Sequence, residues 1–216
     1  MCRGIFKLIQ TQKYTRRSEL SRGALLILDA AESLFAAKDF DAVSINEIAR
    51  HAQTSKANIY HHFKSKEVLY ISVLKNACER SVSALNEVNS QLSDDPLKQL
   101  NQFFAGHLQA ILSSPLSTRL IQRELLENGE QKGKLLAEEV FSDTFANVVR
   151  LVKQAQDKGM IRPGIDPSLL AFLMFGANVV FFESRSVLKH LPDVNFTESP
   201  EEYSSAIFDL LTHGFK

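Results

Sequence analysis

The stretch SKANIYHHFKSKEVLY, residues 55–70, decides the fold. It contains the starts of two helices, because Ser55 and Ser65 each precede a helical apolar pattern, where a serine hydroxyl accepts hydrogen bonds from the amides of the first turn. The second helix opens an apolar stripe with Val68 and Leu69. The face of the first helix that we expect to be buried carries Ile59, Tyr60 and Phe63.

Another short helix precedes this stretch. Ser44-Ile45-Asn46-Glu47 fits a capping box, in which the serine caps the helix and the glutamate bonds back to the serine amide. Two short capped helices joined by about four residues are the plan of a helix-turn-helix, whose second helix lies in the DNA major groove. The apolar stripe of the first of the two is Ile45, Ile48, Ala49 and Ala52.

The outward face of the second short helix predicts contacts with DNA, and it is expected to carry Lys56, Ala57, Asn58, His61 and His62. Lys56 suits the acceptors of guanine, Asn58 suits adenine, and the small Ala57 allows close approach to a thymine methyl. Backbone amides at the helix start, after Ser55, favour phosphate. Other side chains suited to phosphates, which position a protein without reading sequence, are Tyr60, His61, Lys64 and Lys66.

Residues 22–74 resemble the DNA-binding domain of the tetracycline-repressor (TetR) family of bacterial transcriptional regulators. The matching positions are Arg22, Ile27-Leu28, Ala30-Ala31, Leu34-Phe35, Phe40, Ser44, Ile48-Ala49, Ala52, Ser55-Lys56, Ile59-Tyr60, His62-Phe63, Ser65-Lys66-Glu67, Leu69 and Val73-Leu74. The family usually has glycine in place of Asp39 and Gly-Val in place of Gln53-Thr54. A left-handed backbone costs Gln53 about 1 kcal/mol more than glycine, so we expect a slightly altered turn that still binds DNA.

The resemblance implies an all-α homodimer with two domains. Residues 21–66 would form the helix-turn-helix domain, which binds a palindromic operator in double-stranded DNA. Residues 67–216 would bind a small-molecule effector and dimerise through the last two long helices. By position, the resemblance assigns phosphate contacts to Ser44 and Tyr60, base contacts to Lys56, Ala57 and Asn58, and an anchoring role to Lys66.

The formal net charge of zero is the sum of two unlike parts. Residues 1–66 carry 11 Lys and Arg against 6 Asp and Glu, whereas residues 67–216 carry 14 against 19. The basic front favours a polyanionic partner, although a solvated basic face gives the same count. Residues 1–20 are expected to form a basic, flexible arm, which either contacts DNA or is solubilising sequence.

The rest of the chain predicts helices as well, for about nine in all. Helices are expected over 116–127, ended by Asn128-Gly129, and over 134–158, ended by Gly159. An Asp or Ser cap followed by a proline in the first turn opens three more helices. These signals are Asp95-Pro96, Asp166-Pro167 and Ser199-Pro200.

The helix from Ser168 is apolar on nearly every side, so every side must be covered. A second subunit would cover one side, which supports the homodimer; the alternative is the centre of a monomeric core. The expected dimer-interface residues, on this helix and the last one, are Phe172, Phe175, Val179, Phe182, Tyr203, Ile207, Leu210 and Leu211.

Aromatic residues behind residue 66 predict a mostly apolar effector pocket with a few polar groups. The expected ligand-binding residues are Phe103, Phe104, His107, Arg123, Phe141, Phe145, Asn178 and Phe181. The alternatives are a plain core for each phenylalanine, a core histidine for His107, and a salt-bridge ladder of Arg119, Arg123 and Glu127. A bound ligand is expected to tilt the helix that follows Ser65, so that two recognition helices no longer match successive major grooves.

Several classes of function find no support in the sequence. We find no catalytic signature, no metal-ligand cluster and no cofactor motif, and we expect neither an enzyme nor a bound metal or cofactor. The apolar run Leu169–Phe182 is too short to span a bilayer, and Cys2 and Cys78 are expected to be free thiols in the cytoplasm. The alternative function is a helical ligand carrier or protein-interaction bundle without DNA binding. Repressor or activator stays open, repression being commoner in the family.

Overall fold

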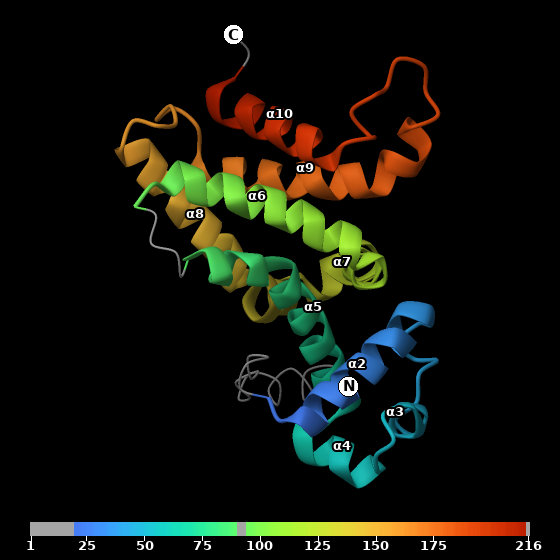
Figure 1. The fold of residues 1–216 in the computed structure, drawn as a ribbon. Helices are drawn as coiled ribbons and strands as arrows, with labels where there is room; N and C mark the ends of the chain where they lie inside the picture. The colour runs from blue at the N-terminus through green and yellow to red at the C-terminus, as the bar shows by residue number, and fades with distance from the viewer. Residues whose placement is uncertain (1–19, 90–93, 215–216) are drawn as a thin grey trace. The chain divides into compact units, whose positions relative to one another are not determined.

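The computed structural model describes residues 20–89 and 94–214, and this part of the chain is helical and without strands (Figure 1). The all-α prediction is therefore confirmed. Nearly all of the arm predicted at residues 1–20 lies outside the described residues. The helices form two compact units: one runs up to Glu79 and includes Leu116–Phe141, and the other comprises Arg80–Pro115 and the chain from Ser142 onward.

The first unit contains α2 (Arg22–Ala37), α3 (Ile45–His51), α4 (Lys56–Phe63), α5 (Lys66–Asn89) as far as Glu79, α7 (Pro115–Leu136) from Leu116, and the π-helical turn η2 (Ala137–Phe141). Serine caps open α2, α3 and α4, as the sequence predicts for the latter two. Each helix supplies apolar side chains to one core, since its buried residues recur at helical spacing. Fully buried examples are Leu28, Phe35, Ile48, Ile59, Leu69, Leu74 and Leu120.

Two polar contacts join α7 to α2 within this unit. Ser117 of α7 donates a hydrogen bond to the carboxylate of Glu32, and both residues are buried. The Arg123 guanidinium donates to the carbonyl oxygens of Phe35 and Lys38, at the end of α2. These carbonyls lie where a helix leaves acceptors unsatisfied, so Arg123 completes the C-terminus of α2.

A buried carboxylate joins α7 to α5. Glu124 is 3% exposed and accepts from the Tyr70 hydroxyl at 2.7 Å, from Asn128 at 3.1 Å and from Lys132 at 2.8 Å. The helix end predicted at Asn128-Gly129 is wrong, because α7 continues to Leu136. Bonds from one carboxylate to side chains four and eight residues on hold this face helical through the glycine, whose helical cost is only about 1 kcal/mol.

The second unit contains α6 (Pro96–Ser113), α8 (Ser142–Asp157), α9 (Pro167–Leu188) and α10 (Pro200–His213), and α6 contacts the other three helices. The three predicted Asp-Pro and Ser-Pro starts are confirmed, with Asp95, Asp166 and Ser199 as caps. Its fully buried apolar residues include Leu100, Phe103, Phe104, Val152, Ala171, Met174 and Phe181.

Helix α9 is longer than the apolar run in the sequence. Its 22 residues have a mean hydropathy of 1.4 over the most apolar window, so by length and composition alone it is the one helix among the described residues that could cross a membrane. Core helices of soluble proteins meet the same criterion. Only 28% of that window is buried within the chain, and several apolar side chains of α9, among them Leu169, Phe172 and Val180, are exposed.

Candidate nucleic-acid interface and effector site

Two local features of the helix-turn-helix can be compared with the sequence predictions: the cap at the start of α3 and the turn between α3 and α4. The Ser44 hydroxyl accepts from the Glu47 amide at 3.1 Å, whereas the Glu47 carboxylate accepts from Lys38 at 2.6 Å. The predicted capping box is thus formed from its serine half, and the glutamate anchors the end of α2 instead. Gln53 adopts φ 51°, the left-handed conformation expected of the residue that stands in place of glycine.

The two faces of α4 differ as a recognition helix requires. Ile59 and Phe63 are buried against the first unit's core, while Lys56, Ala57 and His61 are exposed. The placement of Tyr60 on the buried face was wrong, since its side chain is 38% exposed. The exposure of Tyr60 agrees with its other predicted role as a phosphate contact.

Positive charge gathers on and beside α4, which has no acidic residue. The Lys56 ammonium lies 5.8 Å from the Tyr60 ring centroid, and the Lys66 ammonium lies 4.2 Å from that of Phe40. Lys64 follows α4 with φ 58° and donates to the His61 carbonyl at 3.3 Å. Ser44, Ser55 and Lys64 are exposed, and Lys66 is half-buried.

His62 is the exception on this face. The sequence placed it outward, but the ring is half-buried, and its Nε2 would lie 3.8 Å from a Cβ added at Gly23 of α2. Burial, followed by the neighbouring His61, lowers the pKa of His62. A histidine whose cationic form is disfavoured is a poor partner for phosphate, so the positive charge on and beside α4 comes from Lys56, Lys64 and Lys66.

The helix-turn-helix geometry agrees with the comparison with known families. Residues 27–73 match the family model of bacterial regulatory proteins of the tetR family. Residues 93–216, more than half of the chain, match the model of the tetracyclin repressor-like C-terminal domain. The chain belongs to the TetR family. It is therefore a helix-turn-helix transcriptional regulator, as the resemblance of residues 22–74 implied.

Individual TetR-family proteins resemble the chain over most of its length. The transcriptional regulator RutR of Escherichia coli K12 is 28% identical over 155 residues, covering 70% of this chain and 69% of RutR. The transcriptional repressor NicS of Pseudomonas putida is 26% identical over 216 residues, covering 96% and 100%. The structure of AibR with isovaleryl coenzyme A and operator DNA has a TM-score of 0.64 at 18% identity, covering 90% and 100%.

The second unit of this TetR-family chain contains six of the predicted ligand residues. His107 is buried, with its ring centroid 5.7 Å from that of Phe103 and 5.2 Å from that of Phe175. Asn178 donates to the Phe104 carbonyl at 2.9 Å and lies 3.1 Å from the His107 Nδ1. The six residues are Phe103, Phe104, His107, Phe145, Asn178 and Phe181.

The electrostatics of this core favour neutral groups. Burial lowers the pKa of His107 to about 4, so the imidazole is uncharged at neutral pH. The Asn178 amide is oriented by the Phe104 carbonyl, which can only accept, and its Oδ1 is buried without a hydrogen-bond partner among the described residues. An unpaired buried acceptor costs about 1–3 kcal/mol, so a donor that reached it would bind favourably.

The other two predicted ligand residues lie in the first unit. Arg123 completes the C-terminus of α2, as described above, and Phe141 borders a small void with Leu74 and Glu124. The eight predicted ligand residues are therefore divided between the two units. Their chemical types fitted a pocket, and no sequence pattern shows which unit a helix joins.

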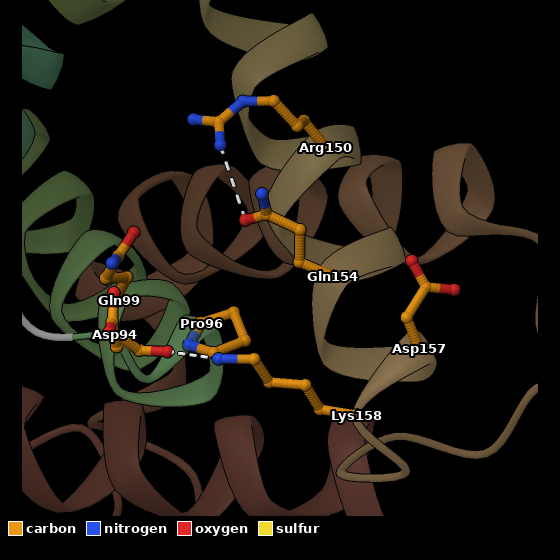
Figure 2. Close-up of a pocket in the computed structure, with 7 residues that line it drawn as sticks. All are labelled: Asp94, Pro96, Gln99, Arg150, Gln154, Asp157 and Lys158. Atoms are coloured by element: carbon orange, nitrogen blue, oxygen red, sulfur yellow. Dashed lines mark hydrogen bonds between the residues drawn. The ribbon is translucent and has the colours of Figure 1, made fainter.

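A surface cleft of about 430 Å³ lies in the second unit, between the start of α6 and the end of α8 (Figure 2). Figure 2 shows Lys158 donating to the backbone carbonyl of Asp94 and Arg150 to the Gln154 amide oxygen. The lining is polar, and it includes none of the predicted ligand residues. Its members are Asp94, Pro96, Gln99, Arg150, Gln154, Asp157 and Lys158.

Thr54 is a residue of the DNA-facing region whose role sequence patterns do not predict. The hydroxyl of Thr54, in the turn before α4, accepts a hydrogen bond from the side-chain amide of Asn58 at 2.9 Å. The signal was present in the sequence, as a hydroxyl-bearing residue four positions before an expected base-reading asparagine.

Proposed function

We propose that the chain is a homodimeric repressor that binds a palindromic operator through α4 and is released by a small, largely apolar effector. The observation that carries this proposal is the outward face of α4, where Lys56, Ala57 and Tyr60 are exposed on a helix without acidic residues. The name of NicS as a repressor supports repression, and AibR, solved with an acyl coenzyme A and operator DNA, supports a ligand-responsive mode.

The proposed division of roles on DNA follows the side-chain chemistry. Lys56 and Asn58 read base edges, and Ala57 permits close approach or contacts a thymine methyl. Ser44, Ser55, Tyr60, His61, Lys64 and Lys66 position the protein on phosphates. The basic arm at residues 1–20 is proposed as an additional DNA contact, tested by deleting it and comparing operator affinity and its salt dependence.

A salt titration of DNA binding tests the proposed function. Fluorescence anisotropy with the promoter of the chain's own gene should show tight binding that weakens steeply as salt rises, because each neutralised phosphate releases counterions. Replacing Lys64 with Ala should weaken binding to all sequences and reduce the salt slope by about 1, because its ammonium is proposed to contact phosphate. Absence of DNA binding, with retained affinity for an apolar ligand, would favour the carrier alternative.

The proposed dimer covers α9. Leu169, Phe172 and Val180 are 51%, 62% and 58% exposed, which is a large apolar surface for one helix to leave in water. Of the eight expected interface residues, Phe172 is exposed, and Phe175, Val179, Phe182, Ile207, Leu210 and Leu211 are half-buried. Tyr203 is buried in its own unit, where its hydroxyl donates to the Ala177 carbonyl at 2.7 Å and its ring stacks on Phe181.

Replacing Phe172 with Glu tests the dimer, because it places a charge in the middle of the proposed interface. Light scattering should show a monomer, and operator affinity should fall by a factor of at least about 10, since two recognition helices no longer bind together. Leu126 of α7, which is 83% exposed, provides a matched control as Leu126→Glu. A dimeric Phe172→Glu protein would contradict the proposed interface.

The proposed effector site is the neutral core around His107 and Asn178. The described buried residues of the second unit include no Asp, Glu, Lys or Arg, so the site favours an uncharged ligand. A ligand hydroxyl or amide N–H would satisfy the buried Asn178 oxygen, while the phenylalanines cover an apolar body. Binding would favour a spacing of recognition helices that does not match the operator. A ligand that binds tightly without changing operator affinity would contradict this mechanism.

The remaining proposals concern what the regulator lacks and where it acts. We propose that it acts in the cytoplasm, as a DNA-binding protein, without catalytic activity. The expectation of no metal or cofactor stays a prediction, although no group of three His, Cys, Asp or Glu side chains suited to a metal occurs in the described part. Burial raises the pKa of the Cys78 thiol to about 12, which disfavours the thiolate at neutral pH.

A further inference from the structure

The Asn58 side chain is held by the turn that precedes its helix. Its Nδ2 donates to the Thr54 Oγ1 at 2.9 Å, and its backbone amide donates to the Ser55 hydroxyl at 3.1 Å. Thr54 is fixed in turn, because its own amide donates to the Ala49 carbonyl at 2.9 Å. The orientation of Asn58 is therefore tied to the end of α3 as well as to α4.

This hydrogen bond leaves part of the Asn58 side-chain amide available to other partners. An asparagine amide has two N–H donors and one carbonyl acceptor. With one N–H engaged by Thr54, the second N–H and the oxygen Oδ1 remain for partners outside the described residues. A donor beside an acceptor matches adenine in the major groove, where N7 accepts and the N6 amino group donates.

We propose that Thr54 is a specificity-determining residue of this regulator, which holds Asn58 ready to read adenine without itself touching DNA. The inference rests on the proposed base-reading role of α4. Ordering a side chain before binding removes part of the entropy that binding would otherwise cost, and it disfavours amide orientations that suit other bases. Thr54 is thus a positioning residue, and its effect is expected in discrimination between bases.

The hydrogen bond from Asn58 gives a physical reason for threonine in place of the family's usual valine at position 54. Valine, the family's usual residue here, has the shape of threonine but no hydroxyl, so it cannot accept from Asn58. Gln53 and Thr54 stand together where Gly-Val is usual. In this chain the pair combines a left-handed turn residue, at φ 51°, with a hydroxyl that controls the base-reading side chain.

The test measures base preference with four proteins: wild type, Thr54→Val, Thr54→Ser and Asn58→Ala. Each base pair of the operator is replaced in turn, and affinities are compared by anisotropy at fixed salt. The pair that Asn58 reads is the one at which Asn58→Ala loses discrimination. We expect the wild type to prefer A·T there, and Thr54→Val to reduce that preference about 5-fold, the effect of releasing one ordered side chain.

Controls separate positioning from a structural role. Thr54→Ser keeps the hydroxyl and should keep the preference, and Thr54→Val in the Asn58→Ala background should change nothing further. Thr54→Val should also leave the salt slope and the affinity for unrelated DNA unchanged. A parallel fall in melting temperature and in all DNA affinities would show a structural role and overturn the inference.

Two other outcomes bear on the proposal. Wild-type preference retained in Thr54→Val, or a preference for G·C at the pair that Asn58 reads, would overturn the role of Thr54 while leaving DNA binding by α4 intact. Failure of the wild-type protein to bind any operator fragment would overturn the proposed function and this inference together.

Discussion

The two compact units of the chain bury polar groups in different ways. In the first unit Glu32 and Glu124 are buried carboxylates, and each has a hydrogen-bond donor on another helix. In the second unit the buried polar groups that we describe are uncharged, and the oxygen of Asn178 has no described partner. Satisfied buried charges fix one arrangement of helices, whereas the unused acceptor in the neutral core is where we propose that an effector binds.

The largest expected effect removes an apolar side chain from the second unit. Phe104 is fully buried, so Phe104→Ala should lower the free energy of unfolding by about 4 kcal/mol through lost burial and the cavity left behind. Urea denaturation measures the change. The matched control Leu126→Ala removes an apolar group that is 83% exposed and should have little effect. Equal losses would contradict an apolar core as the basis of this unit's stability.

The next effect breaks the charged cluster of the first unit. Glu124→Ala should cost about 3 kcal/mol, because the Tyr70 hydroxyl, buried beside it, loses its acceptor and Lys132 loses its ion pair. Glu124→Gln should cost less, since an amide oxygen still accepts from Tyr70. Thermal and urea unfolding of both variants check the order. A loss as large for Gln as for Ala would show that the charge matters more than the hydrogen bond.

Acidification should affect the second unit through His107. The pKa of this buried imidazole is lowered to about 4, below the unfolded value near 6.5, so the unfolded chain binds more protons between these values. Stability contributed by neutral His107 is complete above pH 6.5 and is lost as pH falls, by about 2 kcal/mol at pH 5. Urea midpoints at pH 7.5 and 5 measure it, and His107→Leu should reduce the pH dependence by this amount.

The smallest effect has the opposite sign. Gly129 lies within α7, and a Cβ added there meets no atom within 4 Å. Gly129→Ala should therefore stabilise the first unit by about 1 kcal/mol, through helix propensity and reduced freedom of the unfolded chain. A rise of a few degrees in melting temperature would agree. Destabilisation would show that this part of α7 departs from a regular helix in solution.

Local signals in the sequence predicted most of the helices correctly. The caps at Ser44, Ser55, Asp95, Asp166 and Ser199 are all confirmed, because a cap depends on residues only a few positions away. Long-range features were not accessible in this way. The continuation of α7 through Gly129 depends on a carboxylate that also bonds to Tyr70, which is 54 positions from Glu124.

The same distinction between local signals and long-range contacts applies to the candidate site. The exposed face of α4 follows from helical spacing, and the predicted Lys56, Ala57 and His61 are exposed. The burial of His62 and the contact from Asn58 to Thr54 depend on how α4 packs on its neighbours, which spacing alone does not show. The assignment of Arg123 and Phe141 to the first unit likewise depends on tertiary contacts.

The insertion of α7 into the first unit has a consequence for how the chain is made. Ser117 and Arg123 bond to partners 85 and 88 positions earlier in the chain, on and just after α2. A ribosome that has just completed the helix-turn-helix at residue 66 must add about 70 further residues, for roughly 4–14 s, before α7 is complete and can pack against it. During this interval the nascent DNA-binding region has a complete reading helix and an unfinished core. A fragment that ended at Glu79 would stay in that condition permanently.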